Sequence, residues 1–98
     1  MKIILDDKRP MPSDHYNCVR TYDECVELLR LFRGASYLSL DYDLGGEKTG
    51  YDVLVYMAEN KVRVAHINIH SDHSVGVPRM RKFAQEHFPE ATLTFNSL

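Results

Sequence analysis

Three short apolar runs in this chain each end abruptly in a cluster of polar side chains. The runs cover residues 3–5, 37–40 and 64–69, and the polar clusters that follow them cover residues 6–7, 41–43 and 70–73. A short apolar run bounded by turn-forming residues is typical of a buried strand. If these strands lie parallel, their polar endings meet at one edge of the sheet, where open α/β sheets bind ligands. The pattern therefore predicts one acidic site assembled from distant parts of the sequence.

Five strands and three helices follow from the same pattern. We expect the strands over residues 2–5, 16–20, 36–40, 62–69 and 92–95. The first helix follows a capping box that starts at Thr21, and it ends near Gly34. Thr49 and Asp52 mark the start of the second helix, although a role of Asp52 or Tyr51 in the site is also open. The third helix follows residues 75–78.

The order of these elements is β-β-α-β-α-β-α-β. Strands that alternate with helices are joined by right-handed crossovers and form a parallel sheet. Pro10 and Pro12 make the loop after the first strand rigid and unsuited to a helix. A chain of 98 residues is the size of one domain. We therefore predict a single α/β domain over residues 1–98.

Composition narrows the class of protein. The apolar fraction is 44% and the charged fraction 27%, as in ordinary globular domains, and the net charge of −2 gives no overall attraction to duplex nucleic acid or to membranes. We identify no signal peptide and no apolar stretch near the roughly 20 residues that span a bilayer. Cys18 and Cys25 are too few for a secreted disulfide scaffold, so we expect both to be reduced. These features indicate a soluble, cytoplasmic protein.

Two acidic pairs at strand ends are the candidate metal ligands. They are Asp6 with Asp7, and Asp41 with Asp43. Aspartates after a strand also cap turns, which is the simpler explanation for one pair alone. Four carboxylates at one edge repel each other unless a cation binds, and hard oxygen ligands suit Mg²⁺. We predict Mg²⁺ or Mn²⁺ at Asp6, Asp7 and Asp41, with Asp43 orienting a water.

The third polar ending supplies candidates for proton transfer and phosphate binding. His70 can act as general acid or base, because the ordinary pKa of histidine lies near working pH. Ser71 and His73 are candidate phosphate-binding residues, beside a helix start that offers free amides to an anion. Arg9 is either solvated or pairs with a carboxylate or phosphate. We interpret His66, in the middle of its strand, as structural.

Four short segments then occur in a specific order. They cover residues 5–10, 39–45, 49–52 and 70–71, and Gly76 and Met80 follow them. In this order they resemble the cyclic-phosphate processing receiver-like domain family, a trimmed version of the response-regulator receiver fold. The resemblance covers about residues 2–84. It implies a flavodoxin-like three-layer sandwich with sheet order 2-1-3-4-5, in which the first helix is reduced to a loop.

The resemblance also implies roles for individual residues. Asp6 and Asp7 match the acidic pair that binds Mg²⁺ in receivers, Asp41 matches the phosphoryl acceptor, and Ser71 matches the hydroxyl residue after the fourth strand. The lysine that receivers carry after the fifth strand has no counterpart, because residues 94–96 are Thr, Phe and Asn. Since that lysine helps to hold the acyl phosphate, its absence argues against ordinary phosphorelay signalling.

Two positions depart from the family pattern. Tyr42 stands where members usually carry a histidine between the two aspartates, and His73 stands where they usually carry asparagine. If the usual histidine is the catalytic base, activity in this chain requires His70 or His73 to take its place.

The leading hypothesis is a metal-dependent hydrolase of cyclic phosphates in nucleotides or at RNA ends, with Asp41, Asp43 and His70 as catalytic residues. The expected partner is a small phosphorylated substrate or an RNA end, and neither a membrane nor strongly bound duplex nucleic acid. A second hypothesis is a non-catalytic receiver-like module that docks on another protein. A phosphoacceptor domain using Asp41 ranks third because of the missing lysine.

Overall fold

The expected elements are all present in the computed structural model, which describes residues 1–8 and 15–98; Arg9 and the two prolines that follow it lie outside the described residues. The strands are β1 (Lys2–Leu5), β2 (Asn17–Val19), β3 (Gly34–Leu40), β4 (Arg63–Ile69) and β5 (Thr92–Thr94), and the helices are α1 (Tyr22–Phe32), α2 (Gly50–Glu59) and α3 (Gly76–His87). The strand ends differ from the sequence predictions by at most two residues. The hydrophobic pattern and the helix-start signals together therefore located every element.

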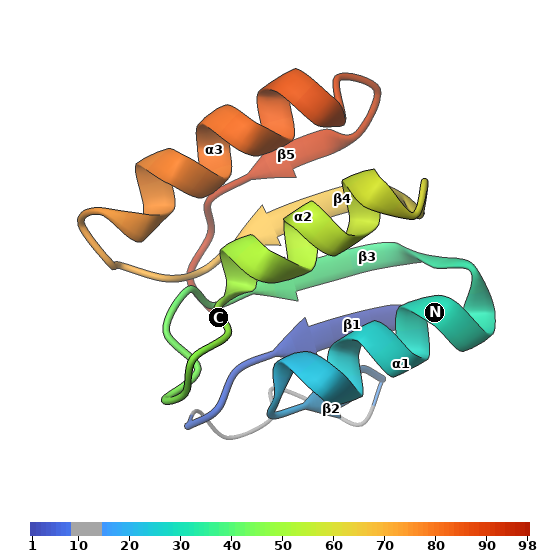
Figure 1. Ribbon diagram of the computed structural model, residues 1–98, viewed down its shortest axis with the longest axis horizontal. Coiled ribbons are helices and arrows are strands. Elements are labelled where there is room, and N and C mark those ends of the chain that lie inside the picture. The colour runs from blue at the N-terminus through green and yellow to red at the C-terminus, as the bar shows by residue number, and fades with distance from the viewer. Residues whose placement is uncertain (9–14) are drawn as a thin grey trace.

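The five strands form one parallel sheet in the order β2-β1-β3-β4-β5 (Figure 1). This order confirms the predicted α/β, receiver-like fold. The long central strands β3 and β4 pair along most of their length, whereas β2 and β5 are short edge strands. Short edges leave few unpaired backbone groups open to other chains.

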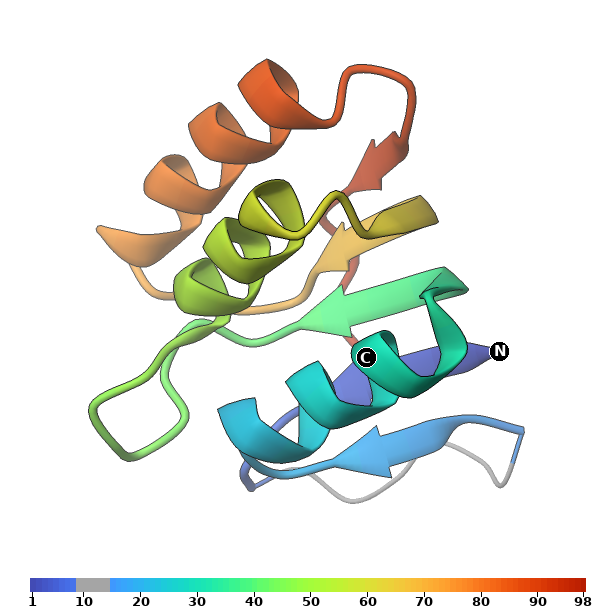
Figure 2. The same cartoon turned by 45° about the vertical axis from the view of Figure 1, so that its right-hand side comes forward.

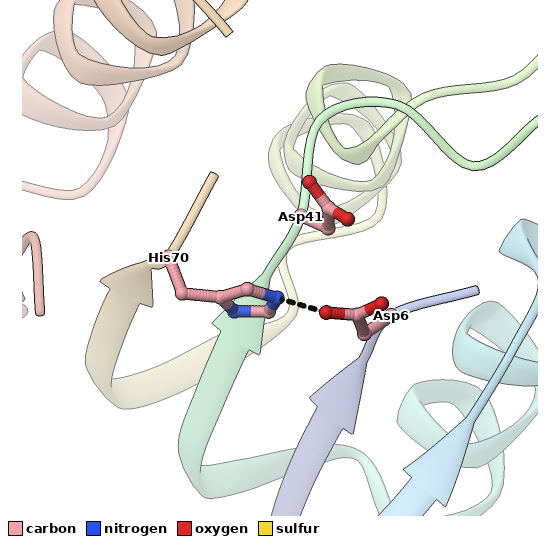
Figure 3. A group of neighbouring side chains, drawn as sticks. All are labelled: Asp6, Asp41 and His70. Carbon is pink, nitrogen blue, oxygen red and sulfur yellow. Dashed lines mark hydrogen bonds and ion pairs between the residues drawn. The ribbon is translucent and has the colours of Figure 1, made fainter. Parts of the chain in front are cut away.

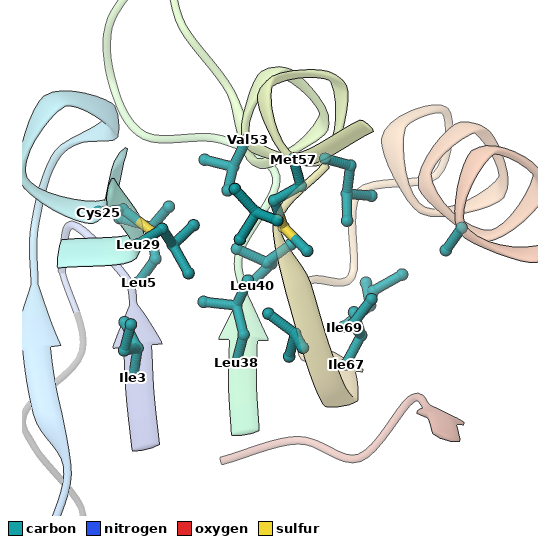
Figure 4. Packing of buried hydrophobic residues seen from close by; sticks show 14 of the residues in the cluster. Ile3, Leu5, Cys25, Leu29, Leu38, Leu40, Val53, Met57, Ile67 and Ile69 are labelled. Atoms are coloured by element: carbon teal, nitrogen blue, oxygen red, sulfur yellow. The ribbon is translucent and has the colours of Figure 1, made fainter. Parts of the chain in front are cut away.

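All three helices lie on the same face of the sheet (Figures 1 and 2). Their apolar residues pack with the strands into one core, which includes Leu29 of α1 and Met57 of α2 (Figure 4). Met80 of α3 belongs to the same core. Against them, β1 presents Ile3 and Leu5, and β3 and β4 present their matching alternate residues. Among the described residues the domain therefore has two layers, and no helix supplies the third layer of the expected sandwich.

Two capping boxes explain where α1 and α2 begin. The Thr21 hydroxyl accepts a hydrogen bond from the amide of Glu24, and the Glu24 carboxylate accepts from the amide of Thr21. Thr49 and Asp52 make the same reciprocal pair at the start of α2. Each box satisfies amides that the first turn of a helix leaves without partners. Asp52 therefore has the capping role that the sequence favoured.

The segment after β5 turns back behind β4 towards β3 (Figures 1 and 2). The backbone of Asn96 bonds to the side chain of Asn68 in β4. Asn68 alternates with Ile67 and Ile69, whose side chains belong to the core beneath the helices. The C-terminal segment thus lies against the helix-free face of the sheet.

Cys18 and Cys25 are both free thiols, as expected from the sequence. Cys25 is fully buried on the core-facing side of α1, and burial raises its thiol pKa to about 12. Cys18 is partly buried in β2. None of the helices in the described part of the chain is long and apolar enough to cross a membrane.

Candidate functional site

Strand register places three polar residues side by side at one edge of the sheet. Leu5 of β1 pairs with Leu40 of β3, and Leu40 pairs with Ile69 of β4. The next residue of each strand is therefore Asp6, Asp41 or His70, all at the same level. The backbone ladder continues through this level, because the Asp41 amide donates to Leu5 O at 3.1 Å and the His70 amide to Leu40 O at 3.0 Å.

The side chains of Asp6, Asp41 and His70 converge (Figure 3). One potential ligand atom from each residue lies within 4.8 Å of the others. His70 Nε2 is 3.0 Å from Asp6 Oδ2, and both side chains are almost completely buried. Asp41 is only partly buried and is the most open of the three. The predicted acidic site at the strand ends thus takes shape around two carboxylates and an imidazole.

The electrostatics of this cluster disfavour an ionised Asp41. Burial raises the pKa of the Asp41 carboxyl above its ordinary value, while a hydrogen bond from Ser71 acts in the opposite direction. The nearby Asp6 carboxylate raises the pKa of Asp41 further, and His70 lowers it. A bound cation would relieve the repulsion between the two carboxylates. The cluster therefore has the charge and the oxygen ligands that a divalent cation prefers.

Replacing Asp41 by asparagine is expected to stabilise the metal-free protein at neutral pH by a few degrees in thermal midpoint. Because the folded-state pKa of Asp41 is raised, its contribution to stability is fully present below the unfolded-state pKa and is lost as pH rises through the folded value. Thermal unfolding of both proteins with a chelator tests this, and the difference should vanish near pH 4, about the ordinary pKa of an aspartate in an unfolded chain. A destabilised Asp41→Asn protein at pH 7 would contradict it.

Asp7 and Asp43 lie outside the cluster of Asp6, Asp41 and His70. Asp7 is partly exposed, and its Oδ2 lies beside Gly45 in the loop between β3 and α2. Asp43 is exposed, and its Oδ1 accepts a hydrogen bond from the Gly45 amide at 2.9 Å. Both carboxylates therefore contact the same loop rather than the ring of His70. Asp7 remains a predicted ligand at the rim of the site.

Ser71 and His73 occupy the segment between β4 and α3. Ser71 hydrogen-bonds Asp41 and also accepts from the His73 amide at 3.2 Å. His73 Nδ1 accepts from the Gly76 amide at 2.9 Å, and the His73 carbonyl accepts from the Val77 amide at 3.1 Å. The first amides of α3, which we expected to face an anion, are thus bonded to His73. A phosphate in this position would have to displace that residue.

Tyr42 packs against the start of α3 instead of joining the cluster. Its ring lies 4.5 Å from the ring of His73, centroid to centroid. The ring also fills the space next to Gly76, where a Cβ atom would collide with it. At the other side of the same segment, a Cβ at Gly50 would collide with the Asp41 carbonyl. The two glycines thus let α2 and α3 approach the segment that carries Asp41.

Ser39 and Asn68 are site-supporting residues that the sequence analysis missed. Ser39 Oγ is 2.7 Å from His70 Nδ1, and Asn68 Nδ2 donates to Ser39 Oγ at 3.0 Å. Both side chains are buried beneath the site. The available signal was the alternation of His66, Asn68 and His70 within an otherwise apolar strand, which indicates a polar face. His66 has the structural role that we expected, since its Nε2 is 2.7 Å from Thr94 Oγ1.

An all-parallel sheet in this order, with an acidic cluster after its first and third strands, defines a receiver-like domain. The chain belongs to the family described as the cyclic-phosphate processing receiver domain, whose model matches residues 1–86. No curated protein and no solved structure matches the chain. The assignment of the chain to this family therefore rests on the family model, and it agrees with the four sequence segments described above.

Proposed function

We propose that this domain hydrolyses cyclic phosphates in nucleotides or at RNA ends with the help of Mg²⁺ or Mn²⁺. The convergence of Asp6, Asp41 and His70 at the carboxyl ends of three neighbouring strands carries the proposal. The membership of the chain in a family associated with cyclic-phosphate processing supports the choice of substrate.

The donor set at the strand ends fits a divalent cation. Asp6 and Asp41 would hold the metal, and Asp7 would complete the set from the rim or through a water. When bound, the metal would polarise a phosphate oxygen and lower the pKa of a bound water. The raised pKa of Asp41 is consistent with a carboxylate that gains from a nearby cation.

The remaining residues would bind phosphate and move the proton. Ser71, which already contacts Asp41, would donate its hydroxyl to a phosphate oxygen. Arg9 and His73 are further candidates for phosphate binding, and Asp43 for orienting the attacking water. Water would add to phosphorus and one ester P–O bond would break, and His70 would carry the proton that the water loses to the leaving ribose oxygen. The product is a phosphate monoester.

Hydrolysis of 2′,3′-cyclic nucleotides with Mg²⁺ or Mn²⁺ tests the proposal. We expect Asp41→Asn to reduce the rate by about 100-fold or more, since it removes a charged metal ligand next to the reacting group. Glu90→Gln is the matched control, because Glu90 is an exposed acid in the turn that precedes β5. Equal rates for wild type and Asp41→Asn would exclude this mechanism, and a wild-type rate no higher than that without protein would favour the non-catalytic binding module.

A further inference from the structure

A continuous row of buried and partly buried polar side chains links His70 to the C-terminal segment. From His70 it runs through Ser39 of β3 to Asn68 of β4. Asn68 then bonds the backbone of Asn96 and the hydroxyl of Thr94 in β5, and Thr94 bonds His66. These side chains lie on the sheet face that carries no helix, where the alternation of β4 places Asn68 opposite Ile67 and Ile69. Because each hydrogen bond joins one donor to one acceptor, fixing the orientation of one side chain decides which atoms donate and which accept along the row.

The backbone of Asn96 fixes the orientation of the Asn68 side chain. Its amide donates to Asn68 Oδ1 at 2.9 Å, and its carbonyl accepts from Asn68 Nδ2 at 2.8 Å. A backbone N–H can only donate and a carbonyl can only accept, so the side-chain amide of Asn68 has one allowed orientation. The Thr94 hydroxyl also donates to Asn68 Oδ1, at 2.6 Å, which agrees with this orientation.

The orientation of Asn68 decides where the hydroxyl proton of Ser39 points. Asn68 Nδ2 donates to Ser39 Oγ, so the hydroxyl proton of this fully buried serine points to its other partner, His70 Nδ1, at 2.7 Å. Nδ1 then accepts a hydrogen bond and carries no proton. A neutral imidazole with a bare Nδ1 has its proton on Nε2, and that nitrogen faces Asp6 Oδ2 at 3.0 Å.

We propose that Asn68 is a positioning residue that, through Ser39, holds His70 as the tautomer protonated on Nε2. In this state His70 donates a hydrogen bond into the acidic site and does not serve as a metal ligand through Nε2. Ligation through Nε2 would require the lone pair that the proton occupies. The use of this proton in catalysis rests on the proposed function, whereas the tautomer itself does not.

Nitrogen-15 NMR of the histidine rings in the metal-free protein tests the tautomer directly, since protonated and bare ring nitrogens resonate far apart. In wild type we expect His70 to show a protonated Nε2 and a bare Nδ1. Asn68→Asp replaces the donor to Ser39 by an acceptor, so the Ser39 hydroxyl should turn to the new carboxylate. His70 Nδ1 should then gain a proton and donate to Ser39.

Thr94→Val is the matched control. It removes one hydrogen bond to Asn68 Oδ1 but leaves both backbone bonds of Asn96. The tautomer of His70 should therefore stay as in wild type. A wild-type His70 protonated on Nδ1, or a folded Asn68→Asp protein with an unchanged Nδ1, would overturn the proposal.

Ser39→Ala keeps the proposal testable if Asn68→Asp does not fold. Loss of the hydroxyl should move the Nδ1 resonance of His70, and hydrolysis should fall by about 10–100-fold, as for other supporting residues of metal sites. Ser39→Thr keeps a hydroxyl at this position, so its Nδ1 resonance and its rate of hydrolysis should be close to those of wild type. An Nδ1 resonance unaffected by Ser39→Ala would count against the proposal. A wild-type protein with the expected tautomer but no hydrolysis would instead refute only the proposed function.

Discussion

Replacing His70 by alanine is expected to destabilise the protein by about 3–5 kcal/mol, because the buried Asp6 carboxylate loses its imidazole partner. The effect is large because Asp6 is only 1% exposed, so water cannot easily replace the lost hydrogen bond. Urea unfolding of the metal-free protein measures the change. His73→Ala is the control, since it removes an exposed histidine with one ring hydrogen bond, and we expect about 0.5–1.5 kcal/mol.

A double-mutant cycle separates the pair from other effects of the substitution. In an Asp6→Asn background, the side chain opposite His70 is a neutral amide that tolerates the loss of its partner better than a carboxylate does. The loss of unfolding free energy caused by His70→Ala should then be markedly smaller than in wild type. An equal cost in both backgrounds would mean that packing, not the interaction of His70 with Asp6, stabilises this edge of the sheet.

Millimolar Mg²⁺ or Mn²⁺ is expected to stabilise the wild-type protein, and Asp41→Asn should abolish this stabilisation. A ligand that binds only the folded state at about 100 times its dissociation constant stabilises that state by about 2.7 kcal/mol. The reason lies in the cluster, where the carboxylates of Asp6 and Asp41 lie within 4.8 Å of each other and the pKa of Asp41 is raised. Thermal unfolding with and without metal provides the measurement.

Glu90→Gln should respond to the metal as wild type does, because Glu90 lies in the turn before β5 and outside the cluster. Asp41→Asn should instead unfold at the same temperature with and without metal. A wild-type protein that does not respond to millimolar metal would favour the binding module over the hydrolase. The two outcomes can be distinguished without knowledge of the substrate.

The fold was predictable because each level of the sequence indicates the same answer. The apolar runs located the strands, and the capping boxes at Thr21 and Thr49 located two helix starts. The sheet order came from the family resemblance and is confirmed. The three-layer arrangement was expected by analogy with receivers, yet the described residues place all three helices on one face.

The site was predictable only in part. Asp6, Asp41 and His70 each follow a strand directly, so the sequence brought them together once the strands were taken as parallel. Their neighbours Asp7 and Asp43 could not be separated from them, because the paths of the loops after the strands decide where the second carboxylate points. Ser39 and Asn68 were missed for a different reason. Their roles depend on which residues face each other across β3 and β4, and only the register supplies that information.

The level arrangement of the three strand ends has a consequence for how this site can change in evolution. Substitutions can alter its chemistry one side chain at a time. A change in chain length within β1, β3 or β4 is another matter. Successive side chains of a strand point to opposite faces, so one added or lost residue would turn the polar side chains of that strand towards the core. It would also move the polar residue at the end of that strand away from the level of the other two. Insertions and deletions that leave the site intact are therefore confined to the connections outside these three strands.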